Sequence, residues 1–173
     1  FPTGAKIIGK TAAREAYRTG QGKITVRSKY SFEETARGKM QIVFTEIPYQ
    51  VNKSRVIEKI ADLVKDKRIE HISDIRDESD RDGMRIVVEL KKDANPQVTL
   101  NRLFKHTQLQ DTQSIIMIAL VNGEPKILNI YEVLKHYIDF QEEVITRRTQ
   151  YDLRKAQERA HILEGYLIAL DNI

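Results

Sequence analysis

The pattern of apolar and polar positions in the first fifty residues predicts one helix and one hairpin of strands. Residues 11–19 form a helical pattern that Thr11 caps and Gly20 ends. Residues 23–33 alternate, which predicts a half-exposed strand with a cationic face. The turn-forming run "ARGKM" then predicts a hairpin between residues 23–33 and 38–46. One face of the first strand carries Ile24, Val26 and Ser28, and the other carries Thr25, Arg27 and Lys29.

The middle of the chain alternates between helix and strand patterns in the order β-α-β-β-α-β. Asn52 and Asn95 stand at helix N-cap positions, and Pro96 follows at the first helical position. Asn122–Gly123 predicts a tight hairpin turn after the last strand. The order predicts an α+β fold whose core is a split βαβ, with four antiparallel strands packed on two helices. The expected strands are 41–47, 70–77, 84–90 and 114–121, the last of them buried, and the expected helices are 53–68 and 96–108.

From Ile130 the pattern becomes that of one long helix with a coiled-coil seam. Apolar or small residues recur at spacings of four and three, and the register shifts near Arg147. A single helix of this length cannot bury such a seam alone, so we expect a partner helix later in the chain or on another chain. The sequence thus divides into a domain at 1–129 and a helix at 130–173. The two seams are Val133, Tyr137, Phe140 and Val144, and then Thr149, Leu153, Ala156, Ala160, Leu163, Leu167 and Leu170.

Composition limits the classes of function. The 173 residues include no Cys, which excludes disulfides and thiolate metal sites and fits a reducing, cytoplasmic setting. No apolar run approaches the ~18 residues of a membrane span, and no signal peptide is recognisable. The chain starts at Phe1 rather than Met and ends within a helical pattern, so we expect a fragment of a longer protein.

Three local motifs suggest ligands but lack features that those ligands require. Residues 78–89 approach a calcium loop, but Arg85 and β-rich flanks oppose an ion, so a hairpin turn with Gly83 at positive φ is the better interpretation. "TGQGK" at 19–23 lacks the spacing of a phosphate-binding loop and favours a plain turn, with a backbone contact to a nucleic-acid phosphate as the alternative. The expected central strands lack the paired aromatics of an RNA-recognition motif. The four histidines show no metal-ligand spacing, so we expect no metal site. No Ser has a nucleophile elbow and no Tyr has a recognisable catalytic setting, so we expect no catalytic residues.

Basic charge is concentrated in the first third of the chain. Residues 1–55 hold eleven Lys and Arg against four Asp and Glu, a net charge of +7, whereas the whole chain carries +4. Such an asymmetry is typical of a surface that meets a polyanion. A solvated basic face without a partner is the alternative.

Several long, collinear stretches resemble the A subunits of type IIA DNA topoisomerases, and of bacterial gyrase in particular. The resemblance covers essentially the whole chain; topoisomerase IV A subunits share part of it. Departures occur at "TQSIIM" and "GKTAAREAY", where the family commonly has S-F-G-x-N-M and a Gly-Ile pair. The stretches are "FPTG", "AYRTGQGKI", "TEIPYQVNKSRVIEKIADLV", "RDESDRDGMRIVVELKKDAN", "ALVNGEPKI" and "RRTQYDLRKAQERAHILEG".

The resemblance implies a tower domain followed by the first arm of a coiled coil. The family's catalytic tyrosine motif is absent, so the fragment alone is expected to be inactive. The family's reaction is ATP-driven negative supercoiling, with Mg²⁺ and ATP bound through the B subunit in an assembly of two A and two B subunits. The implied partners are therefore duplex DNA, a second A subunit, and the B subunit, with no membrane.

The tower's implied role is to hold bent duplex through backbone contacts, which require Lys and Arg rather than base-reading groups. Arg147 and Arg148 are further candidates, for which ion pairs at the tower–helix junction are the alternative. A structural, dimerising module in which the basic face is incidental is the competing hypothesis for the chain, and a calcium-responsive switch is a third. The main candidate DNA contacts are Lys23, Arg27 and Lys29 on the strand face, with Lys6, Lys10 and Arg14 near them in sequence.

Overall fold

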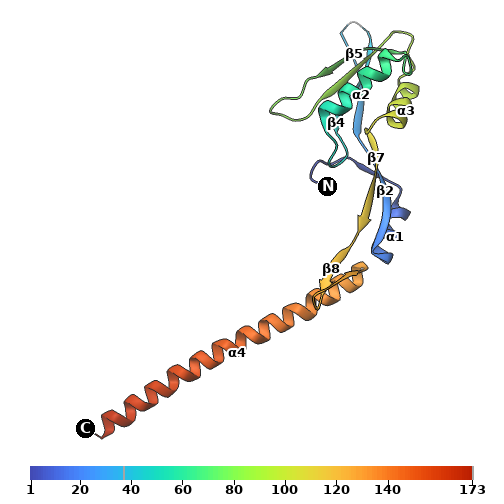
Figure 1. Ribbon diagram of the computed structural model, residues 1–173. Helices are drawn as coiled ribbons and strands as arrows, with labels where there is room; N and C mark the ends of the chain where they lie inside the picture. The colour runs from blue at the N-terminus through green and yellow to red at the C-terminus, as the bar shows by residue number, and fades with distance from the viewer. Residues whose placement is uncertain (37, 173) are drawn as a thin grey trace. The chain divides into compact units, whose positions relative to one another are not determined.

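A computed structural model describes residues 1–36 and 38–172 and groups them into two compact units (Figure 1). The first unit comprises residues 1–17 and 21–116, and the second comprises residues 18–20 and those from 117 onward. The division into domains at 1–129 and 130–173 stays a prediction. The elements are β1 (Lys6–Ile8), α1 (Lys10–Thr19), β2 (Gln21–Arg27), β3 (Lys29–Glu34), β4 (Met40–Glu46), α2 (Lys53–Lys65), β5 (Ile72–Asp77), β6 (Ile86–Leu90), α3 (Pro96–His106), β7 (Gln110–Ile116), β8 (Ile118–Val121), β9 (Glu124–Ile127) and α4 (Ile130–Asp171).

The first unit contains two antiparallel sheets. The first sheet has the strand order β1-β2-β7, and Figure 1 shows α1 and β7 beside β2. Helix α1 covers one face of β2, because a Cβ atom on Gly22 would lie 2.9 Å from the Cβ of Ala16. The helix begins at Lys10, so Thr11 lies inside it and the predicted Thr11 cap is wrong. Gly20 ends the helix at φ +79°, as predicted.

The second sheet, in the order β3-β4-β6-β5, carries the main core on one face. Helices α2 and α3 bury their apolar sides against it, with Ile60, Leu100 and Leu103 fully buried beside Phe44. The Asn52 side chain accepts a hydrogen bond at the start of α2, and Asn95 does so at the start of α3. Both predicted N-caps are thus confirmed.

The opposite face of the second sheet is covered by charged side chains. Val43 and Val87 point to this face and are fully buried, although they lie outside the main core cluster. Arg85 Nη2 lies 2.6 Å from Glu33 Oε2, and Arg85 Nε lies 3.1 Å from Glu78 Oε2. The aliphatic stems of such long side chains cover apolar surface while their charges pair at the surface. The ion-pair network comprises Glu33, Lys39, Asp74, Arg76, Glu78, Arg85 and Glu89.

Two predictions about strand pairing are wrong. The strand expected at 23–33 is two strands that belong to different sheets: β2 pairs with β1 and β7, whereas β3 alone forms the hairpin with β4. Arg37, which belongs to the predicted turn "ARGKM", lies outside the described residues. The predicted split βαβ is also wrong, because its fourth strand, β7, belongs to the first sheet. In the second sheet, β3 pairs with the edge of β4 instead.

The second unit consists of the β8–β9 hairpin and α4. Asn122 and Gly123 have φ of 54° and 83°, which confirms the predicted tight turn. The buried strand expected at 114–121 is wrong, because it divides at Met117 and leaves Leu120 74% exposed. Helix α4 starts with a capping box between Asn129 and Glu132 and buries no residue among those described. Within the described residues, no helix is both long and apolar enough to cross a membrane.

Candidate nucleic-acid interface

The face of the first sheet that α1 leaves open is built by strand register. Residues directly opposite in an antiparallel pair share a face, so Lys6 lies beside Arg27 and Lys23 beside Ser114. The side chains of Ile24 and Val26 alternate to the other face and are buried. We call this surface the open face. Its strand residues are Lys6, Ile8, Gln21, Lys23, Thr25, Arg27, Gln110, Thr112, Ser114 and Ile116.

The open face is cationic and polar. None of its ten residues is acidic, three carry a positive charge, and Thr112 and Ser114 present hydroxyl groups. Cations, hydroxyls and amides are the side chains that contact phosphate and sugar in DNA. The surface therefore suits a duplex backbone better than it suits base recognition.

Arg27 is held in place at one end of the open face. Its Nε donates a hydrogen bond of 2.8 Å to Gln110 Oε1, and its guanidinium lies 4.7 Å from the centroid of the Phe104 ring. A guanidinium over an aromatic face keeps its charge and its remaining N–H donors. Arg27 is thus a fixed cation rather than a mobile one.

The structure brings Lys6, Lys23 and Arg27 together and separates them from Lys10 and Arg14. The latter two are on α1, which packs on the other face of β2. The basic residues of the first third therefore do not form a single patch, although they lie close together in the sequence. Only the structure distinguishes the two groups, because helix and strand place neighbouring residues on opposite sides.

Lys29 and Lys6 are influenced by one carboxylate, that of Glu46. Lys29 Nζ lies 3.1 Å from Glu46 Oε1, while the other carboxylate oxygen accepts a hydrogen bond from the backbone N–H of Ala5. The Ala5 hydrogen bond, the Lys29 pair and the nearby charge of Lys6 together lower the pKa of Glu46. Among the described residues, none of the open-face cations Lys6, Lys23 and Arg27 has a carboxylate within ion-pair distance.

Arg147 and Arg148 lie on α4, in the second unit. Arg147 Nη1 pairs with Glu143 Oε1 at 3.2 Å, one turn earlier on the same helix. This is an exposed pair within α4, which is worth little to stability. The DNA-binding assignment of the eight basic residues stays a prediction.

Two carboxylates of the calcium-like turn at 78–89, those of Glu78 and Glu89, form ion pairs. Glu78 accepts hydrogen bonds from Arg76 and Arg85, which lower its pKa, and Glu89 is held by Lys39, Arg76 and Ser73, which lower its pKa to about 2. Gly83 has φ 147°, so the positive φ predicted there is confirmed. Among residues 1–36 and 38–172, no group of three or more His, Asp or Glu side chains could hold a metal ion.

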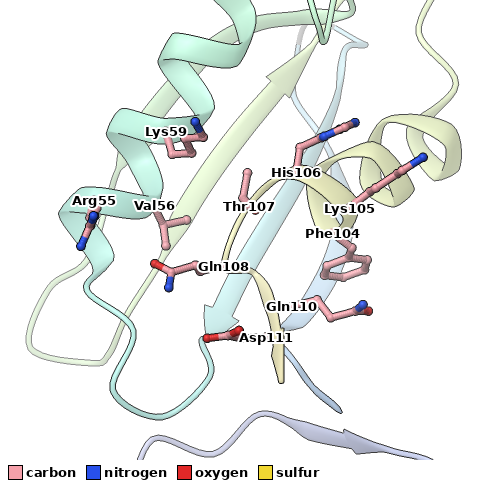
Figure 2. Close-up of a pocket in the computed structure, with 10 residues that line it drawn as sticks. All are labelled: Arg55, Val56, Lys59, Phe104, Lys105, His106, Thr107, Gln108, Gln110 and Asp111. Atoms are coloured by element: carbon pink, nitrogen blue, oxygen red, sulfur yellow. The ribbon is translucent and has the colours of Figure 1, made fainter. Parts of the chain in front are cut away.

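Sequence reasoning missed a second basic surface, a hollow of about 710 Å³ in the first unit (Figure 2). Arg55 and Lys59 line it from α2, and Lys105 and His106 line it from the end of α3. The spacing of Arg55 and Lys59, four residues apart on one helix, is a signal for a shared face. The sequence holds no comparable signal for the approach of α3.

The whole chain is similar to known proteins. The profile of the family described as the A subunit of DNA gyrase/topoisomerase IV matches residues 1–173. The chain is 64% identical to the DNA gyrase A subunit of Clostridium acetobutylicum and 58% identical to that of Halalkalibacterium halodurans, over all of this chain and 21% of each relative. It is 56% identical to the DNA gyrase A subunit of Staphylococcus aureus, over 20% of that protein. The chain thus spans about a fifth of the length of these relatives.

Proposed function

Because the chain belongs to the family of DNA gyrase and topoisomerase IV A subunits, we propose that it is the part of a gyrase A subunit that holds duplex DNA by its backbone. In this proposal the residues of the first unit form the tower, and α4 is the first arm of the coiled coil. The contribution is mechanical, since the catalytic tyrosine motif is absent from the chain.

The proposed parent reaction is ATP-driven supercoiling in the cytoplasm by two A and two B subunits. A tyrosine outside this chain, in the rest of the gyrase A polypeptide, attacks a DNA phosphate, and the covalent bond conserves the energy for resealing. Mg²⁺ and ATP belong to the B subunit in this proposal. This chain keeps the cleaved duplex in place while a second duplex passes.

The open face is the observation that supports the proposal. Lys6, Lys23 and Arg27 share it with hydroxyl groups and without an acidic neighbour on the same face of these strands. Neutralising phosphates with such cations releases counterions, so binding should weaken steeply as salt rises. Base-specific readout is not needed for this role.

The test is fluorescence anisotropy with a labelled duplex at two salt concentrations. We expect the Lys6→Gln/Lys23→Gln variant to bind about sixtyfold more weakly at ~0.1 M salt, since each of the two phosphates left without its cation costs roughly eightfold there. The matched control is Lys10→Gln/Arg14→Gln, which removes the same charge from the other side of β2. Equal affinities for the two variants, or salt-independent binding by the unmodified chain, would contradict the proposal.

A dimerising structural module is the second candidate. Helix α4 has 42 residues, none of them buried among those described, and Leu153, Leu163 and Leu167 are each about half exposed or more. An exposed seam of this kind needs a partner. A chain that dimerises through α4 yet shows no salt-dependent affinity for duplex would favour this candidate over the first.

A further inference from the structure

We propose that the hollow between α2, α3 and the start of β7 is a second backbone contact for the same duplex that lies on the open face. This inference rests on the proposed function and extends it to a surface on the other side of Arg27. We call this hollow the α2–α3 groove. Its lining residues are Arg55, Val56, Lys59, Phe104, Lys105, His106, Thr107, Gln108, Gln110 and Asp111.

The charge of the α2–α3 groove is positive and uncompensated. Arg55, Lys59 and Lys105 are exposed, and the described residues place no carboxylate within ion-pair distance of them. The single acid, Asp111, accepts a 2.8 Å hydrogen bond from the backbone N–H of Thr112. The cations are thus available to an external anion.

The nearby cations of the second sheet behave differently. Lys39, Arg76 and Arg85 all form ion pairs of 3.2 Å or less with carboxylates of the network. Lys53, at the start of α2, is paired with Asp77 at 2.7 Å. In the first unit, the cations of the α2–α3 groove are therefore unpaired, whereas the cations on the charged face of the second sheet are paired with carboxylates.

The groove continues into the open face through Arg27. Gln110 and Phe104 line the groove, and these are the two residues that hold the Arg27 guanidinium. Figure 2 shows Gln110 and Phe104 at the groove's edge, below Lys105 and His106. A backbone that follows Lys23 and Arg27 along β2 therefore meets the groove cations next.

The lining favours phosphates over an acidic protein segment. Val56 and Phe104 are 1% and 6% exposed, so the groove has no open apolar pocket for the side chains of a peptide. Gln108 and Gln110 instead add amide groups to the cations, a combination that suits phosphate oxygens. A peptide interface would need apolar anchors in addition to charge.

The experiment measures how the affinity of the 173-residue chain for a duplex of about 30 base pairs, roughly three helical turns, depends on salt. We expect Lys59→Gln/Lys105→Gln to reduce the slope of log affinity against log salt by about 1.8, which is about 0.9 for each phosphate that is no longer neutralised. The matched control, Lys91→Gln/Lys92→Gln, removes two exposed lysines outside the groove and should leave the slope unchanged. Circular dichroism melts confirm that both variants fold.

The outcomes separate this inference from the proposed function. An unchanged slope for the groove variant, together with a reduced slope for Lys6→Gln/Lys23→Gln, would overturn the groove contact and leave the open face intact. Failure of the unmodified chain to bind duplex would overturn both. Loss of polyglutamate binding by the groove variant, with duplex binding unchanged, would identify an acidic protein partner and would also overturn the inference.

Discussion

At the scale of single residues, the run "TGQGK" is explained by two glycines with different tasks. Gly20 adopts φ +79°, where a side chain would be strained, and so ends α1. Gly22 has an ordinary strand conformation, but any Cβ there would lie 2.9 Å from Ala16 Cβ. The run is neither a phosphate loop nor only a turn, because its second glycine allows helix and strand to approach closely.

We expect Gly22→Ala to lower the free energy of unfolding by about 1–3 kcal/mol, the usual cost of overpacking a well-filled contact. Urea denaturation followed by circular dichroism measures this. The matched control is Gly165→Ala on exposed α4, where nothing lies within 4 Å and alanine should favour the helix. Full stability of Gly22→Ala would show that α1 does not need this close approach to β2.

At the scale of elements, β5 is tied to the start of α2 by one ion pair. Lys53 Nζ lies 2.7 Å from Asp77 Oδ2, and this pair together with Ser79 lowers the pKa of Asp77 from 3.8 to about 2. Both side chains are about a third exposed, so solvent screening limits the contribution to that of a surface pair. The pair joins two elements that residues 66–71 separate in the sequence.

The sign of the pH effect follows from the lowered pKa. A carboxylate whose folded pKa lies below its unfolded value adds stability above the unfolded value and loses it as the pH falls. We therefore expect Asp77→Asn to be less stable than the unmodified chain by about 0.5 kcal/mol at pH 7. Thermal melts from pH 7 to pH 2 should show that the difference fades between about pH 4 and pH 2. A constant difference across that window would contradict the assignment.

The sequence predicted where helices, strands and turns occur better than it predicted which strands pair with one another. The predicted caps at Asn52 and Asn95 and the predicted turn at Asn122–Gly123 are confirmed, because each depends on interactions between residues only a few positions apart. One partner of β2 is β7, and Arg27 and Gln110, which lie opposite each other in that pair, are 83 residues apart. Alternation continues unbroken through Ser28, so the change of sheet between β2 and β3 leaves no trace in the pattern.

The candidate site was predictable to the same extent. Alternation along β2 correctly placed Arg27 on the face opposite the buried Ile24 and Val26. The contribution of Thr112 and Ser114 depends on pairing with β7, and the opposite placement of α1, with its two basic residues, depends on how that helix packs. Both are tertiary properties, which a local pattern does not encode.

At the scale of the whole molecule, the two units differ in how their elements are supported. The first unit has a core of fully buried residues, including Phe44, Ile60 and Leu103. Within the described residues, α4 buries none of its side chains, although a helix in water draws most of its stability from packing. We expect stability to be distributed unevenly along the chain.

Hydrogen exchange should reveal this difference. Amides in β4, β6 and the buried sides of α2 and α3 should exchange only through global opening, whereas those at 149–171 should exchange at least about a hundredfold faster. Mass spectrometry of the 173-residue chain at low concentration measures both sets together. Slow exchange throughout α4 would instead show that a second copy already covers its seam.

Ser28 is the single residue that links β2 to β3 and so joins the two sheets of the first unit, and this short link affects how force passes between them. One run of backbone passes from β2 in the first sheet to β3 in the second with this single residue between them, and its N–H bonds the carbonyl of Leu109 where the chain returns toward β7. A force applied to the open face is therefore transmitted along β2 and β3 to the core, because no flexible loop lies between the two strands. Under the proposed function, this junction is a stiff connection between the surface that holds the duplex and the core of the first unit.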